Sequence, residues 1–159
     1  MTKTMTAPLP EEYLLDFHND IDIDAPLTVV FDALLEQLGP GSEMPDGRPF
    51  PMKLEPWPGG RWYRDLGNNA GHFWGHVQVI KPPTLLEITG PLFMSYAAIS
   101  HLQYRLTEQG RGTRLSLIHR AIGEMASEQR QGLSQGWGHK LLRIRQVAES
   151  RKSAIGGTK

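Results

Sequence analysis

One histidine stands among apolar residues in a pattern that suits chemistry. Leu115, Leu117 and His119 alternate along a predicted strand, which places the imidazole on the inward face. An inward imidazole can contact a ligand or donate a proton near neutral pH. It can equally be a core side chain with a hydrogen-bonding partner. Leaving it unpaired would cost about 1–3 kcal/mol, so we expect a partner, for which Asn19 is a candidate.

Two other polar sets resemble metal sites in composition but lack the spacing of one. His72 and His76 lie on a predicted strand, where four residues span about 13 Å, too far to share an ion. The alternating aspartates of residues 16–24 diverge along a strand and form a solvated face. Gly59 and Gly60 precede a strand rather than a helix, so they make no phosphate loop. We therefore expect no metal ion and no cofactor.

An enzymatic interpretation rests on few groups. The chain has no cysteine, no serine in a nucleophile elbow and no recognisable Ser-His-Asp set. Chemistry of the cyclase or hydratase kind needs an acid/base pair in one cavity. The sequence offers only His119 with Asn19 or Tyr104, so we assign no catalytic residue.

The element that must position these groups is a long helix predicted at residues 125–150. Apolar side chains recur along it every three or four residues and mark one face: Leu133, Trp137, Leu141, Ile144 and Ala148. Glycines interrupt the helix at positions 132, 136 and 138, although each costs about 1 kcal/mol relative to alanine. That cost predicts close packing, or a groove, beside Trp137.

The rest of the chain predicts one short helix and several strands. Alternation at residues 13–24 predicts a strand, and Ala25-Pro26 begins a helix that Gly39-Pro40 ends. Five or six strands joined by short turns follow, which implies an antiparallel sheet. Such a sheet curls, and the long helix must cover its concave face. We predict an α+β fold with a flexible tail at 1–12, one domain at 13–150 and a flexible tail at 151–159.

A curled sheet around one helix often leaves a pocket, which for a small ligand measures roughly 300–1,000 Å³. Each candidate wall residue is also an ordinary core position, and the two interpretations are compatible because a cavity wall is an incomplete core. A register shift of one would turn Arg61 and Tyr63 inward in place of Trp62. The residues that we predict to line the cavity are Asn19, Trp62, Phe73, Val77, Tyr104, Leu117, His119, Leu133, Trp137 and Leu141.

Composition and charge limit the classes of partner. A chain of 159 residues with zero net charge and no cysteine fits one cytoplasmic domain and argues against nucleic-acid binding. It has no signal pattern and no apolar run that could span a bilayer, so we expect no membrane insertion. Residues 1–80 carry twelve acidic and five basic side chains, and residues 81–159 carry the reverse. We expect Arg114 and Arg120 to pair with the aspartates of the first strand.

Basic residues also gather near the end of the last helix: Lys140, Arg143, Arg145, Arg151 and Lys152. They complement the negative end of the helix dipole. The alternative is that they form a surface for an acidic partner.

Several motifs resemble the START-like or Bet v-like (SRPBCC) superfamily, and in particular the homologues of the activator of the 90-kDa heat-shock-protein ATPase. They are Ile23–Ala33, Pro58–Gly60, Gly75–Val77 with Pro82 and Pro83, Gly112–His119, and Gly136 and Trp137 with Leu141. The resemblance extends from about residue 13 to residue 150. It implies a helix-grip fold, with a seven-stranded sheet around the C-terminal helix and an internal apolar cavity. Family members often have a tryptophan-rich second helix where this chain has a loop at residues 39–51.

Three functions fit these observations. We favour the binding of a small hydrophobic or aromatic molecule between sheet and helix, with His119 as its polar contact. A cyclase- or hydratase-type enzyme would use the same cavity, and converging polar groups there would favour it. A chaperone-cofactor-like protein would bind a protein partner through its surface. A filled interior and a large exposed apolar patch would favour that third function.

Overall fold

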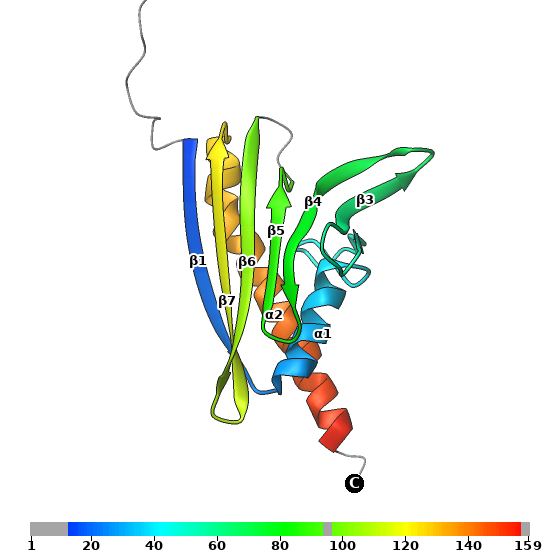
Figure 1. Cartoon of the computed structure of the whole chain (residues 1–159), viewed down its shortest axis with the longest axis vertical. Coiled ribbons are helices and arrows are strands. Elements are labelled where there is room, and N and C mark those ends of the chain that lie inside the picture. The colour runs from blue at the N-terminus through cyan, green and yellow to red at the C-terminus, as the bar shows by residue number, and fades with distance from the viewer. Residues whose placement is uncertain (1–12, 94–96, 157–159) are drawn as a thin grey trace, which may run out of the picture.

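The computed structural model describes residues 13–93 and 97–156 and shows seven strands and two helices (Figure 1). The predicted tail at 1–12 lies outside the described residues. In chain order the elements are β1 (Leu14–Ile23), α1 (Leu27–Leu38), β2 (Lys53–Leu54), β3 (Arg61–Gly67), β4 (Ala70–Lys81), β5 (Leu85–Gly90), β6 (Ala98–Gln109), β7 (Gly112–Gly123) and α2 (Ser127–Gly156).

The strands form one antiparallel sheet in the order β1-β7-β6-β5-β4-β3-β2. Most neighbours in the sheet are also neighbours in the chain, whereas β1 pairs with the distant β7. The sheet curves, and α2 crosses it and packs against α1 (Figure 1). Apolar side chains of the sheet and of both helices meet in one core. The predicted α+β helix-grip fold is therefore confirmed.

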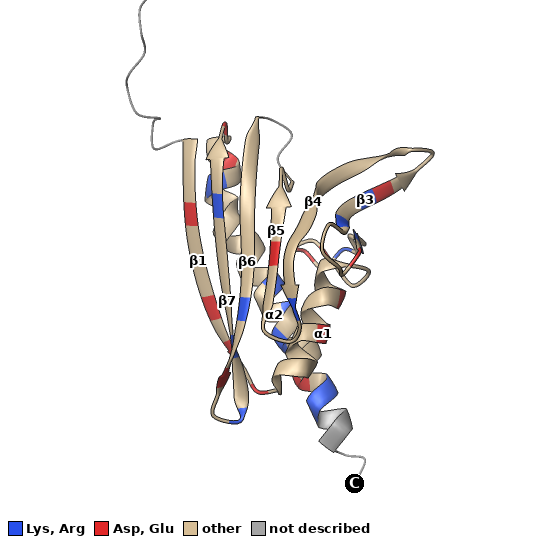
Figure 2. Ribbon diagram, in the orientation of Figure 1, with Lys and Arg blue, Asp and Glu red and all other residues tan. Residues whose placement is uncertain are grey.

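Opposite charges face each other across β1 and β7. In the register of this pair Asp16 lies opposite Arg120 and Asp22 lies opposite Arg114. The Nε atom of Arg120 is 3.1 Å from Asp16 Oδ1, and that of Arg114 is 3.0 Å from Asp22 Oδ1. Figure 2 shows the acidic bands of β1 beside the basic bands of β7. The expected pairing of these arginines is confirmed, and it accounts for part of the charge asymmetry along the chain.

The C-terminal helix continues beyond the predicted end of the domain. We predicted a flexible tail from residue 151, but α2 runs to Gly156. Arg151 forms an ion pair with Glu36 of α1, and the Lys152 Nζ atom lies 2.6 Å from Asp24 Oδ1. These contacts tie the helix beyond residue 150 to the first half of the chain. Residues 157–159 lie outside the described part of the chain.

A β-bulge redirects side chains where β3 pairs with β4. Trp62 lies opposite Gly75 and Tyr63 lies opposite Phe73, so Trp74 is the extra residue on β4. A bulge shifts the alternation of a strand by one residue. Trp74 consequently packs against the core, whereas Phe73 is 43% exposed. Gly75 is required here, because a Cβ at this position would lie 2.7 Å from the Thr89 carbonyl oxygen.

Neither of the helices in the described residues is long and apolar enough to cross a membrane.

Candidate functional site

A cavity of about 450 Å³ opens at one end of the interface between the sheet and α2. The loop at residues 39–51 forms one wall, and the N-terminal half of α2 forms another. Side chains from β3, β4 and the segment after β5 complete it. The lining residues are Ser42, Glu43, Met44, Pro45, Phe50, Trp62, Trp74, Phe93, Glu128, Gln129, Gly132, Leu133, Gly136, Trp137 and Lys140.

Five aromatic side chains make a continuous apolar wall. Trp74 lies at its centre, with ring centroids 4.9 Å from Trp62, 6.1 Å from Phe50 and 5.9 Å from Phe93. Phe93 in turn lies 6.3 Å from Trp137 on α2. The Trp62–Trp74 and Trp74–Phe93 contacts are edge-to-face, a favoured geometry for aromatic pairs. These contacting rings make one side of the cavity aromatic and apolar.

Two glycines of α2 leave the cavity open. A Cβ added at Gly132 or Gly136 would meet no heavy atom of the described structure within 4 Å, and both positions line the cavity. Of the two predicted explanations for these glycines, a groove beside Trp137 is therefore the one observed. Gly138 is equally unobstructed at its Cβ position but does not line the cavity.

His119 lies behind the cavity wall, where it holds Trp137. The indole Nε1–H of Trp137 donates to His119 Nδ1 at 3.1 Å, and His119 Nε2 lies 2.9 Å from Ser100 Oγ. Because the indole nitrogen can only donate, Nδ1 is the acceptor and the neutral ring carries its proton on Nε2. Burial lowers the pKa of His119 to about 4. The histidine is therefore neutral near pH 7 and donates to Ser100.

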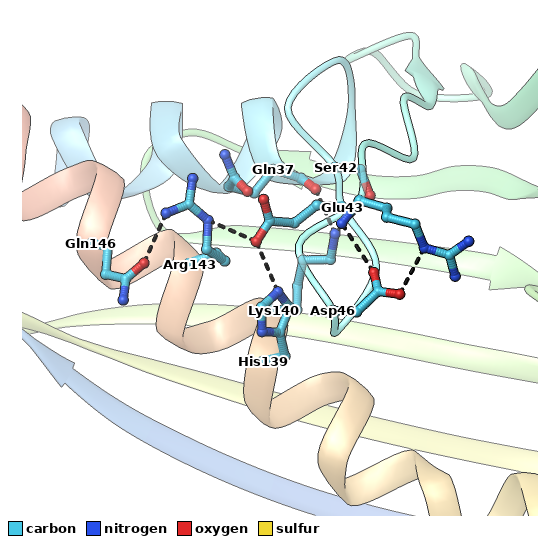
Figure 3. Close-up of polar contacts among 9 residues, drawn as sticks. Gln37, Ser42, Glu43, Asp46, His139, Lys140, Arg143 and Gln146 are labelled. Atoms are coloured by element: carbon cyan, nitrogen blue, oxygen red, sulfur yellow. Dashed lines mark hydrogen bonds and ion pairs between the residues drawn. The ribbon is translucent and has the colours of Figure 1, made fainter.

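Polar groups gather where the loop at 39–51 meets α2 (Figure 3). The Lys140 Nζ atom donates to the Gln37 carbonyl oxygen at 2.8 Å and to Ser42 Oγ at 2.7 Å. Burial lowers the pKa of Lys140 to about 8, while the nearby carboxylate of Glu43 acts in the opposite direction. The cavity thus combines an aromatic wall with a polar end at Ser42, Glu43 and Lys140.

The polar end includes a carboxylate that is already paired. Glu43 Oε1 lies 2.9 Å from His139 Nε2 and 3.1 Å from Arg143 Nε. Figure 3 shows Glu43 between these two side chains of α2. Within the described ranges, no three His, Cys, Asp or Glu side chains come together in an arrangement that would hold a metal ion.

Residues 24–149 match the family described as Activator of Hsp90 ATPase homolog 1-like protein. The chain belongs to this family. No curated protein sequence matches the chain significantly.

Solved structures of the same helix-grip type are similar to this family member. An uncharacterized protein from Rhizobium leguminosarum has a TM-score of 0.67 at 15% identity, covering 86% of this chain and 95% of its own. A protein from Mesorhizobium loti has a TM-score of 0.63 at 18% identity, with coverage of 86% and 98%. The di-domain ARO/CYC StfQ from the steffimycin biosynthetic pathway has a TM-score of 0.63 at 15% identity, with coverage of 89% and 52%. At these identities the likeness shows a shared fold.

The structure of this family member distributes the ten predicted wall residues over several environments. Three of them line the cavity: Trp62, Leu133 and Trp137. Four are buried in the core elsewhere: Val77, Tyr104, Leu117 and Leu141. His119 lies behind Trp137, and its side-chain partner is Ser100 rather than Asn19. Asn19 is half-buried on β1 opposite Leu117, and Phe73 is turned outward by the bulge.

Sequence reasoning missed several wall residues that come from irregular segments. Phe50 belongs to the loop, Trp74 lies at the bulge, and Phe93 follows β5. No periodic pattern marks such positions. Lys140 carried a usable signal, because it lies three residues after Trp137 on the helical face that also holds Leu133.

Proposed function

We propose that this protein binds a small hydrophobic or aromatic molecule in the cavity beside the N-terminal half of α2. The observation that carries the proposal is an open cavity with an aromatic wall between the sheet and α2. Its volume of about 450 Å³ lies within the range of ligand sites in proteins, roughly 300–1,000 Å³. Faces and edges of Trp74, Phe93 and Trp137 would contact the body of the ligand.

The helix keeps this cavity open at the expense of its own stability. Replacing alanine by glycine inside a helix costs about 1 kcal/mol, and Gly132 and Gly136 both line the cavity without any steric need for glycine. Side chains at these two positions would occupy the space in front of Trp137. A retained opening with an aromatic wall supports a binding role.

The neighbours of known context also favour a small molecule. StfQ is named as part of the steffimycin biosynthetic pathway, and DynU16 comes from the dynemicin biosynthetic locus. Both share the fold of this chain. From these two proteins we infer for this chain only that the fold interacts with a small molecule.

The arrangement of polar groups favours binding over catalysis. Neither His119 nor Tyr104 lines the cavity, although they were the candidates for an acid/base pair. His119 is neutral and hydrogen-bonded to Trp137 and Ser100. Burial raises the pKa of the Tyr104 hydroxyl, which finds no hydrogen-bond partner among the described residues. The interior is also not filled, which argues against a purely surface-binding protein.

A thermal-shift screen tests the proposal. Purified protein is heated with aromatic polyketides, flavonoids, fatty acids and sterols, beside the variants Gly136→Leu and Gly138→Leu. A ligand at about 100 times its dissociation constant should stabilise the wild type by about 2.7 kcal/mol. The leucine at 136 should abolish the shift, and the leucine at 138, outside the cavity, should preserve it. No shift with any class, or an equal shift in Gly136→Leu, would contradict the proposal.

A further inference from the structure

The polar end of the cavity contains an ammonium group with two neutral partners. Lys140 lines the cavity on the same face of α2 as Gly136 and Trp137. Its Nζ atom donates to a backbone carbonyl, that of Gln37, and to the hydroxyl of Ser42. A protonated lysine has three N–H donors, so one donor remains after these two hydrogen bonds.

The charges around Lys140 do not balance. Glu43 is the nearby carboxylate, but one of its oxygens already contacts both His139 and Arg143. Even without counting His139, the group has two basic side chains, Arg143 and Lys140, and one carboxylate, that of Glu43. A partly buried cation without a paired anion is unfavourable, because it has lost water without gaining a counter-charge.

The other charged groups that face this region are occupied or distant. Glu36 on α1 pairs with Arg151, and Asp46 in the loop pairs with Arg48 at 2.7 Å. Glu128 also lines the cavity, but it lies twelve residues before Lys140, about 18 Å along the helix axis. Among the described residues that line the cavity, Lys140 is thus the only basic one, and it lies at the polar end.

We propose that the ligand of this cavity is an amphipathic acid, whose carboxylate binds Lys140 and whose apolar body lies against Trp74 and Trp137. This inference rests on the proposed binding function and narrows it to one chemical class. The carboxylate would accept the remaining N–H of Lys140, and Ser42 would hold the amine in place. Hydrogen bonds between charged groups are shorter and stronger than neutral ones. The burial that lowers the pKa of Lys140 supports the same conclusion, since it disfavours an ammonium group without an anion.

The test compares acids with neutral molecules of the same shape. The two probe pairs are 2-naphthylacetic acid with 2-naphthylacetamide, and dodecanoic acid with dodecan-1-ol. Each probe is titrated at pH 7 into wild type, Lys140→Met and Lys81→Met, and binding is measured by calorimetry. Lys81→Met makes the same change of charge on an exposed residue at the end of β4. In wild type and Lys81→Met each acid should bind at least about tenfold more tightly than its neutral partner. In Lys140→Met this preference should disappear while the neutral probes keep their affinity.

A second measurement needs no variant. Between pH 7.5 and 9.5 the wild-type affinity for the acids should fall, because Lys140 loses its proton, whereas the affinity for the neutral probes should stay constant. Three results would overturn the inference about the acid but leave the proposed binding function intact. They are equal binding of acid and neutral probes at pH 7, a preference for acids that survives Lys140→Met, and acid binding that does not change with pH. If no probe bound the wild type, the proposed binding function would be contradicted as well.

Discussion

At the scale of single residues, Trp137 has two roles that use different parts of its side chain. Its ring lines the cavity, and its indole N–H donates to the buried His119. His119 is in turn hydrogen-bonded to Ser100, so two consecutive hydrogen bonds fix the orientation of the Trp137 ring in the cavity wall. The histidine therefore supports the cavity wall through Trp137 and does not line the cavity itself.

The substitution Trp137→Phe tests this chain of hydrogen bonds. It leaves His119 Nδ1 as a buried acceptor without a donor, so we expect the free energy of unfolding to fall by about 1–3 kcal/mol. Trp57→Phe is the matched control, because Trp57 is 54% exposed and a surface change usually stays within about 0.5 kcal/mol. Urea unfolding of both variants measures the difference. Equal effects of the two substitutions would contradict the structural role of the hydrogen bond.

Lys140 should make stability depend on alkaline pH. Its pKa is about 8 in the folded protein, against a model value of 10.5 for an unperturbed lysine. Between these values the unfolded chain binds more protons, so the free energy of unfolding rises with pH. We expect wild type to gain up to about 1.4 kcal/mol per pH unit relative to Lys140→Met within this window. Urea unfolding at pH 8 and 9.5 measures the gain, and parallel curves for the two proteins would show the prediction to be wrong.

The environment of a single residue could be predicted from the sequence only where the residue follows a regular pattern. The alternation around His119 correctly predicted a buried imidazole with a partner. It did not identify the partner, because Ser100 lies on the neighbouring strand β6 and Trp137 lies on α2. The alternation failed at Phe73, since the bulge at Trp74 depends on how β3 pairs with β4 rather than on local sequence.

At the scale of elements, α2 combines a packed face with an open one. Its apolar stripe, from Leu133 to Ala148, is buried against the sheet and α1. Near its N-terminal end the glycines leave space in front of that stripe. Helical periodicity predicted the apolar stripe. The glycines of the helix allowed two explanations, close packing or a groove beside Trp137. The structure distinguishes them, because a Cβ at Gly136 would meet no described atom within 4 Å and the cavity lies beside it.

Alanine substitutions distinguish a glycine beside open space from a glycine whose close backbone contacts exclude a Cβ atom. Gly136→Ala and Gly138→Ala should each raise the free energy of unfolding by up to about 1 kcal/mol, because a Cβ there meets no described atom within 4 Å. Gly75→Ala should lower it, since its Cβ would lie 2.7 Å from the Thr89 oxygen. Thermal and urea unfolding measure whether each substitution raises or lowers the free energy of unfolding. A loss of stability in Gly136→Ala would instead indicate close packing beside Trp137.

At the scale of the whole molecule, the fold was predictable and the position of the cavity was not. Strand alternation, the turn at Gly39-Pro40 and the long helical stripe specify an antiparallel sheet on a helix. Side chains of α1 are buried against α2, and none of the described cavity-lining residues belongs to α1. The mouth of the cavity is built from the loop at 39–51 and the bulged hairpin, whose conformations depend on contacts distant in sequence.

Charge pairing is a further property of the whole molecule that sequence could anticipate. The acidic first half and basic second half meet at β1 and β7 and again where the end of α2 contacts Glu36 and Asp24. Figure 2 shows the bands of opposite charge on β1 and β7 side by side. Much of the basic charge at the end of α2 is thus paired within the molecule, while Lys140 faces the cavity.

The most direct test of the central claim uses the tryptophans of the chain as reporters. Of its four tryptophans, Trp62, Trp74 and Trp137 line the cavity, whereas Trp57 is exposed and lies outside it. The indole N–H signals of ¹⁵N-labelled protein are followed by NMR during titration with the tightest-binding compound. We predict that the three cavity signals shift together and saturate while the Trp57 signal stays in place. Saturable binding that moves Trp57 alone, or that moves none of the four, would contradict a ligand site in this cavity.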